Sequence, residues 1–263
     1  MNPPLRDGYK HEAIQRPYIV HAPPNTALGK IVEEDEFEAS RKWFKDRMEH
    51  NLGYPVTLRS ASRLHTWWRR ALVEPVTFVT QPEEVQPLTR LIDWPEVFHA
   101  YPRLLIMDPC AGKRSILLAI AAELPMAVEY ATFISNDINP SYDTDMHFDV
   151  MDPMQWASAP SDLDIIVSSV PWELADAILP DLVLRARLFC AFHVSSDWIA
   201  NGPLWRRCWI AWLQNEGVLA EIRGLPRVKG RGTRRCTWLI IFASPEIKNM
   251  FWQPTLDCFT LFD

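Results

Sequence analysis

Short apolar segments alternate with longer helical patterns between Phe78 and Ala243. The apolar segments are strand-sized and predict buried strands at Leu104–Met107, Ala131–Ser135, His147–Val150, Asp164–Ser168, Leu188–Val194, Val218–Arg223 and Thr237–Ala243. Helical patterns follow Pro82 and cover Ser115–Leu124, Glu173–Arg187 (interrupted at Pro180) and Gly202–Asn215. Alternation of this kind requires right-handed crossovers and an α/β sheet with helices on both faces. Ligands of such sheets bind at the carboxyl ends of the strands.

The chain divides by composition into three predicted parts. Residues 1–75 form a helical N-terminal extension, residues 76–245 form the α/β domain, and residues 246–263 form a C-terminal tail. Helical patterns within the extension cover Glu33–Asn51 and a segment that ends near Leu72. Since 48% of the 263 residues are hydrophobic, the chain can bury a full core.

Charge and cysteine usage limit the class of protein. A net charge of −6 argues against indiscriminate binding along a nucleic-acid backbone. The five cysteines are widely spaced and contain no C-x-x-C pair, which predicts reduced thiols and neither a disulfide framework nor a metal site. The sequence has no membrane-length apolar run and no signal-peptide pattern. We therefore expect no membrane association and an intracellular location, in cytoplasm or nucleus, or in a host cell for a viral source.

The stretch LLIMDPCAGKRS runs from a predicted strand into a predicted helix. Its Gly-Lys pair is similar to a triphosphate-binding loop, but that motif needs a glycine where Met107 stands and Ser or Thr where Arg114 stands. The triphosphate loop is therefore excluded. Gly112 permits close backbone approach to a ligand, and Asp108 can accept a hydrogen bond from a cationic amine. The alternative is that Asp108 is only a helix N-cap.

The next predicted strand ends at Asn136-Asp137, and an acid there can bind both hydroxyls of a ribose. The alternative for Asp137 is a turn former in Asp-Ile-Asn-Pro. A ribose site without a Gly-x-Gly-x-x-Gly loop favours a nucleoside cofactor that lacks phosphates. S-adenosylmethionine has this character.

On these motifs the chain resembles the class I S-adenosylmethionine-dependent methyltransferases, over roughly residues 76–244. Its closest likeness is to the nucleic-acid amino-methyltransferases of the adenine-N6 type. The resemblance implies a Rossmann-like sheet, mostly parallel with an antiparallel last strand. It also implies that S-adenosylmethionine is bound by Thr80, Asp108, Pro109, Gly112, Asp137 and a third-strand acid, either Asp149 or Asp152 with Asp149 preferred.

The fourth strand leads into Ser169-Val170-Pro171-Trp172, which resembles the catalytic loop of these enzymes. An exocyclic amine of a base is a poor nucleophile because its lone pair is delocalised. The resemblance implies that Ser169 and a carbonyl fixed by Pro171 accept its hydrogen bonds, and that Trp172 stacks on the extruded base. The alternative is a plain turn with a core tryptophan.

Two departures from the family pattern leave the substrate open. Serine replaces the usual Asp or Asn and is familiar in cytosine-N4 enzymes, whereas Val170 replaces a proline, as in ribosomal-RNA adenine enzymes. A third departure is Lys113-Arg114, which replaces small residues after the glycine. DNA and RNA, and adenine and cytosine, therefore all remain candidate substrates.

A basic segment between the last two predicted strands is the candidate nucleic-acid contact. Its residues are Arg227, Lys229, Arg231, Arg234 and Arg235. The alternative is a solubilising hairpin tip. Target recognition would come from this segment, the N-terminal extension, a protein partner or a second copy of the chain.

The sequence predicts methyl transfer to the exocyclic amine of a base, adenine N6 first. The competing hypotheses are an inactive methyltransferase-fold subunit that binds nucleic acid or acts as a scaffold, a cytosine-N4 enzyme, and a methyltransferase for small molecules or proteins.

Overall fold

The computed structural model describes residues 79–172, 174–223, 225–226 and 235–253. The predicted N-terminal helices lie outside these ranges, as do residues 254–263 of the predicted tail. The proposed division into three parts therefore stays a prediction.

The described chain alternates helices and strands, as the sequence pattern predicts. The strands are β1 (Leu104–Asp108), β2 (Ala131–Ser135), β3 (Ile165–Ser168), β4 (Phe189–Ser195), β5 (Leu219–Ile222) and β6 (Cys236–Phe242). The helices are α3 (Pro82–Leu91), α4 (Trp94–Ala100), α5 (Ser115–Glu123), α6 (Ala127–Tyr130), the 3-10 helix η2 (Gln155–Ser158), α7 (Ala175–Val183), α8 (Ser196–Ala200), α9 (Leu204–Asn215) and α10 (Pro245–Phe251). None of the described helices is long and apolar enough to cross a membrane.

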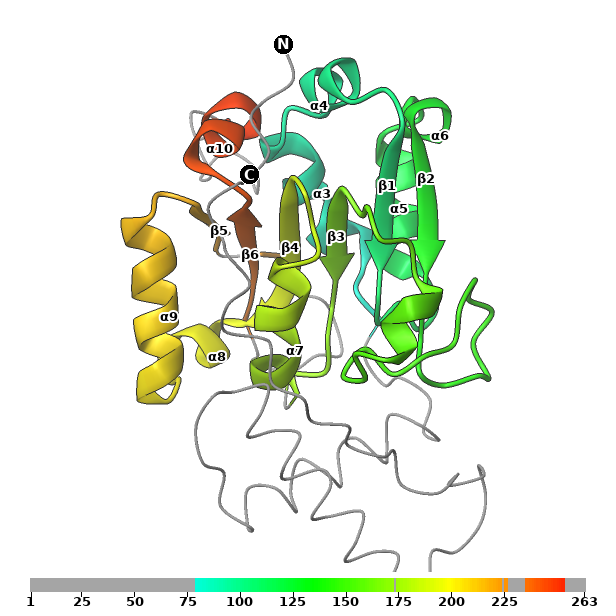
Figure 1. Ribbon diagram of the computed structural model, residues 1–263. Coiled ribbons are helices and arrows are strands. Elements are labelled where there is room, and N and C mark those ends of the chain that lie inside the picture. The colour runs from blue at the N-terminus through cyan, green and yellow to red at the C-terminus, as the bar shows by residue number, and fades with distance from the viewer. Residues whose placement is uncertain (1–78, 173, 224, 227–234, 254–263) are drawn as a thin grey trace, which may run out of the picture.

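The strands form one sheet in the order β2-β1-β3-β4-β6-β5. Strands β1 to β4 are parallel where they pair, and β6 runs antiparallel to both of its neighbours (Figure 1). This arrangement confirms the predicted α/β class and the antiparallel last strand. The chain places β2 on one side of β1 and then crosses over to place β3 on the other side. The neighbours β1 and β3 therefore mark the switch point of the sheet, where α/β sheets bind ligands.

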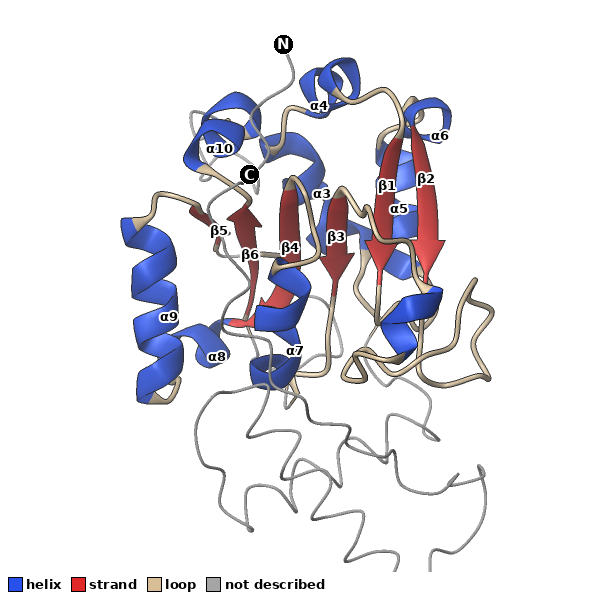
Figure 2. Ribbon diagram, viewed as in Figure 1, coloured by secondary structure: helices blue, strands red, loops and turns tan. Residues whose placement is uncertain are grey.

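Helices cover both faces of the sheet and give it two cores (Figure 2). Residues alternate between the faces: Ile106 and Ile165 belong to one core, whereas Met107 and Ile166 belong to the other. The first core includes buried residues of α3, α4, α5 and α10. The second includes buried residues of η2, α7 and α9. Because both faces are buried, the central strands β1, β3, β4 and β6 consist mostly of apolar residues.

The predicted strand His147–Val150 does not form. Only an isolated bridge joins Asn136 to Met146. The side chain of Asn136 binds both backbone groups of Phe148, since Oδ1 accepts from its N–H at 2.9 Å and Nδ2 donates to its carbonyl at 3.0 Å. A side chain therefore takes the bonds that a strand ladder would have used.

The turn between β1 and α5 contains an unusual backbone conformation. Among the described non-glycine residues, only Arg114 has a positive φ, with φ 60° and ψ 20°. A side chain in this left-handed region costs about 1–2 kcal/mol because Cβ crowds the carbonyl oxygen. Gly112, two residues earlier, adopts φ 49° without that cost.

We therefore predict that Arg114→Gly raises the free energy of unfolding by about 0.5–1 kcal/mol, the relieved strain less the added entropy of glycine. Urea denaturation measures the change. The matched control is Lys113→Gly, whose φ is not positive, and which we expect to destabilise by about 0.5–1 kcal/mol. Equal effects of the two variants would contradict the strain at position 114.

Candidate active site

Asp108 is the last residue of β1 and is only 1% exposed. Its Oδ1 accepts hydrogen bonds from Ser168 Oγ at 2.7 Å and from the Cys110 backbone N–H at 3.1 Å. Burial raises the pKa of Asp108 from 3.8 to about 7, against the effect of these two hydrogen bonds. The carboxyl group is thus poised to ionise when a cation reaches it.

Asp137 joins the end of β2 to the turn after β1. Its Oδ2 accepts from the Gly112 N–H at 2.8 Å, and its Oδ1 accepts from the Asn139 N–H at 2.9 Å. Burial raises its pKa, which these two bonds partly offset. Each carboxylate oxygen keeps a further lone pair, so the group can still accept hydrogen bonds from a ligand.

Asn136 holds three loops together and was missed by the sequence-based prediction of the site. It is fully buried, and its Nδ2 donates to the carbonyl of Pro109 at 2.9 Å as well as to that of Phe148. The predicted cofactor residue Pro109 therefore contributes its carbonyl to this link. An asparagine at a strand end carries no sequence signal for such a role, because its two partner residues, Pro109 and Phe148, lie in two other segments of the chain.

Of the two candidate third-strand acids, Asp149 is 7% exposed, while Asp152 is half-buried. Asp149 Oδ1 accepts from the Met151 N–H at 2.8 Å. The pKa of the Cys110 thiol is raised well above its ordinary value by burial and by the nearby carboxylates of Asp137, Asp108 and Asp149. The charges of all three acids thus act on one buried thiol, which favours Asp149 over Asp152.

The loop after β3 lies beside this carboxylate group. Ser168, whose hydroxyl binds Asp108, directly precedes Ser169. Ser169 Oγ lies 3.4 Å from His193 Nδ1 of β4. Pro171 and Trp172 are half-buried, and Trp172 packs against the core that includes α3 and α5.

Other predicted residues are not joined to this group. Thr80 is 3% exposed and directly precedes Gln81, the N-cap of α3. No hydrogen bond within the described ranges ties its side chain to the three carboxylates. Arg235 is exposed, and its carbonyl accepts from the Ser196 N–H at 2.9 Å. The remaining predicted nucleic-acid contacts, Arg227, Lys229, Arg231 and Arg234, lie outside the described residues.

The three carboxylates are hydrogen-bond acceptors, and they fit a ligand that combines positive charge with several hydrogen-bond donors. Two largely buried carboxylates, Asp108 and Asp137, lie where the adjacent strands β1 and β2 end, and a third, Asp149, lies in the segment between β2 and β3. A cation there would offset their desolvation. A phosphate would meet this negative charge instead. The residues therefore suit a cationic nucleoside such as S-adenosylmethionine, with its sulfonium, ammonium, ribose hydroxyl and adenine amine groups.

Several solved structures are similar to this chain at low sequence identity. No protein-family model and no curated protein matches the chain. A Listeria monocytogenes protein, named provisionally as a class I S-adenosylmethionine-dependent methyltransferase, is 12% identical with a TM-score of 0.47, over 81% of this chain and 84% of that one. A methyltransferase subunit of a type I restriction-modification system from Streptococcus thermophilus is 12% identical with a TM-score of 0.46, over 70% of this chain and 48% of that one.

A third similar structure is magnesium protoporphyrin IX methyltransferase from Synechocystis with bound S-adenosylmethionine. It is 15% identical with a TM-score of 0.38, over 83% of this chain and 99% of that one. The chain spans about half the length of the Streptococcus subunit.

The raised pKa of Asp108 predicts a pH-dependent effect of Asp108→Asn. An acid whose pKa rises from 3.8 to about 7 on folding favours the folded state below pH 3.8, and that contribution is lost as the pH rises through 7. Asparagine keeps an oxygen for both hydrogen bonds and never ionises. The free energy of unfolding of Asp108→Asn, relative to that of the parent, should therefore increase by roughly 2–3 kcal/mol from pH 5 to pH 8.

Urea denaturation of the parent and the variant at both pH values measures this change. Asp162→Asn, at an exposed position, is the matched control and should change the stability little at either pH. A pH-independent difference for Asp108→Asn would rule out a buried ionisation at this position.

Proposed function

We propose that this protein transfers a methyl group from S-adenosylmethionine to the exocyclic amine of a nucleic-acid base, adenine N6 first. The observation that carries the proposal is the 2.7 Å hydrogen bond between Ser168 Oγ and Asp108 Oδ1. It fixes the loop that carries Ser169, Pro171 and Trp172 beside the carboxylates suited to a cationic cofactor. Donor and acceptor sites would then share one edge of the sheet.

On the cofactor side, each carboxylate has a distinct proposed partner. Asp108 would accept from the cationic amine, Asp137 from the ribose hydroxyls and Asp149 from the adenine amine. Gly112, with its positive φ, lets the backbone approach the nucleoside closely. When bound, the cofactor supplies a methyl group on a positively charged sulfur, and the protein residues hold and orient it.

On the acceptor side, Ser169 Oγ and a carbonyl fixed by Pro171 would accept hydrogen bonds from the base amine. These bonds stabilise the positive charge that develops on its nitrogen. His193 Nδ1, 3.4 Å from Ser169 Oγ, restrains the direction of the hydroxyl. Trp172 would stack on the base. Exposed Arg235 and the basic segment before it would contact phosphates.

One observation favours a second candidate, a methyltransferase-fold subunit that binds no cofactor. Both oxygens of Asp137 already accept backbone N–H groups, from Gly112 and Asn139. The turn would be satisfied without a ribose. In that case the protein would act in nucleic-acid binding or as a scaffold. Direct measurement of cofactor binding separates the two candidates.

We predict that S-adenosylmethionine binds and that its affinity falls about tenfold between pH 8 and pH 6. The cationic amine needs ionised Asp108, whose pKa in the free protein is about 7. Calorimetry at both pH values measures the change. Methylthioadenosine, which lacks the amino acid and the positive charge, is the control and should show little pH dependence. No binding of S-adenosylmethionine would favour the scaffold candidate.

We also predict that incubation with methyl-labelled cofactor and either DNA or RNA yields N6-methyladenine, detected by nucleoside mass spectrometry. Ser169→Ala should lower kcat by about 10²-fold, because one acceptor of the developing charge is lost, while cofactor affinity is unchanged. Ser158→Ala, at an exposed serine of η2, is the control. Detection of N4-methylcytosine instead would identify cytosine as the target base. Cofactor binding without any methylated base would point to a small-molecule or protein substrate.

A further inference from the structure

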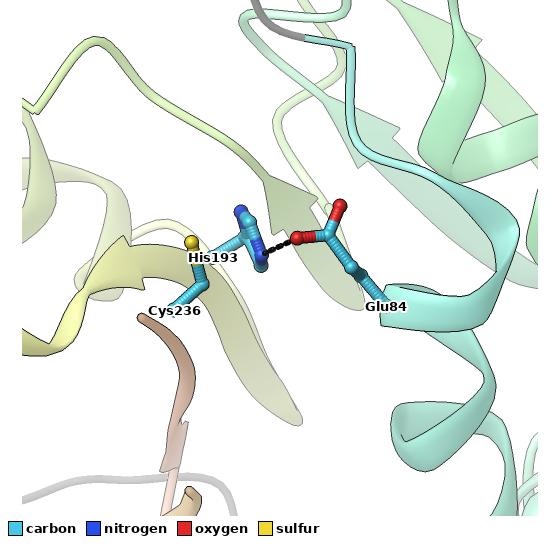
Figure 3. Close-up of side chains that lie close together, drawn as sticks. All are labelled: Glu84, His193 and Cys236. Carbon is cyan, nitrogen blue, oxygen red and sulfur yellow. Dashed lines mark ion pairs between the residues drawn. The ribbon is translucent and has the colours of Figure 1, made fainter. Parts of the chain in front are cut away.

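Three buried side chains from distant parts of the sequence meet beside Ser169 (Figure 3). Glu84 comes from α3, His193 from β4 and Cys236 from the start of β6. They are 2%, 0% and 4% exposed. One carboxylate oxygen, one ring nitrogen and the sulfur all lie within 4.8 Å of one another.

The donor set matches a transition metal. Carboxylate oxygen, imidazole nitrogen and thiolate sulfur are the ligand types of zinc sites. Glu84 Oε1 and His193 Nε2 are 3.5 Å apart. Two oxygen and nitrogen ligands of one tetrahedral zinc ion are separated by about 3.4 Å, since each lies about 2.0–2.1 Å from the ion. These two atoms therefore already have the spacing of a shared ligand pair.

A second observation points to a ligand at this place. His193 Nε2 is buried and makes no hydrogen bond within the described residues, because its contact with Glu84 lacks hydrogen-bond geometry. A buried polar nitrogen without a hydrogen bond is costly. A metal ion bound at Nε2 would supply the missing interaction.

The outer contacts also match a metal site. Metal-bound histidines use their other ring nitrogen in a hydrogen bond, and metal-bound carboxylates are themselves hydrogen-bonded. His193 Nδ1 lies 3.4 Å from Ser169 Oγ. Glu84 Oε2 accepts from the Gln81 N–H at 2.9 Å, as part of the capping box of α3. His193 Nδ1 and Glu84 Oε2, the atoms not assigned to the metal, thus hold the two ligand side chains in place.

We propose that Glu84, His193 and Cys236 bind one divalent metal ion of the zinc class, with water as the fourth ligand. The thiol of Cys236 loses its proton to solvent when the ion binds. The absence of a C-x-x-C pair predicted no metal site, but these ligands come from three elements that only folding brings together.

The proposed ion has two consequences. It links α3 to β4 and β6, so binding adds to the stability of the fold. With the metal at Nε2, the His193 ring carries its proton on Nδ1, and this N–H donates a hydrogen bond to Ser169 Oγ. The site does not depend on methyl transfer, because its ligands and geometry stand apart from the carboxylates assigned to the cofactor.

The test uses the full chain without an affinity tag, stripped by a chelator and titrated with Co²⁺, a spectroscopic substitute for zinc. We expect one Co²⁺ per chain, visible absorption typical of tetrahedral cobalt, and a near-ultraviolet band from thiolate-to-metal charge transfer. Zinc should displace the cobalt and raise the Tm by several degrees. Neither cofactor nor nucleic acid is added, so failure of the proposed function leaves this result unaffected.

Cys236→Ser should lose the charge-transfer band, whereas the matched control Cys208→Ser, at an exposed cysteine, should keep it. Circular dichroism checks that both variants fold. If Cys236→Ser does not fold, X-ray absorption of the cobalt-loaded parent decides, and we expect one sulfur neighbour. No charge-transfer band in the parent, a band that persists in Cys236→Ser, or a metal environment without sulfur would overturn the proposal.

Discussion

The hydrogen bond between Ser168 Oγ and Asp108 Oδ1 is the contact on which the arrangement of the candidate site depends. Both residues end parallel strands, β3 and β1, that lie side by side at the switch point of the sheet. A carboxyl group this deeply buried needs a donor, and Ser168 supplies one from the loop that leads into Ser169. One interaction therefore satisfies a buried acid and fixes the two loops of the candidate site relative to each other.

Similar contacts extend this linkage across the sheet edge. The bond from Gly112 N–H to Asp137 ties β2 to the same turn, and Asn136 connects that turn to the segment before Asp149. Each link is buried, so each resists competition from water. The result is a rigid group of carboxylates whose cost of desolvation a cationic ligand would reduce. Rigid placement of this kind favours reactions that depend mainly on positioning.

The proposed metal site and the proposed acceptor loop share His193. One ring nitrogen, Nε2, lies 3.5 Å from Glu84 Oε1, while the other, Nδ1, lies 3.4 Å from Ser169 Oγ. Occupancy of the metal site would therefore set the protonation of the nitrogen that contacts Ser169, the proposed acceptor for the base amine. In this way a stabilising ion between α3, β4 and β6 would also restrain the direction of a hydroxyl group at the acceptor site, although neither proposal requires the other.

The sequence by itself determined the α/β class, most strands to within two residues, and the acids at the strand ends, because apolar periodicity and strand-end position are local properties. It wrongly predicted a strand at His147–Val150, since the competing bonds come from the distant side chain of Asn136. Only the tertiary structure brought Asp108, Asp137 and Asp149 within electrostatic reach of one buried thiol, Cys110, and placed Glu84, His193 and Cys236 together. Their proximity follows from strand order and crossover packing, which place residues far apart in sequence at one edge of the sheet.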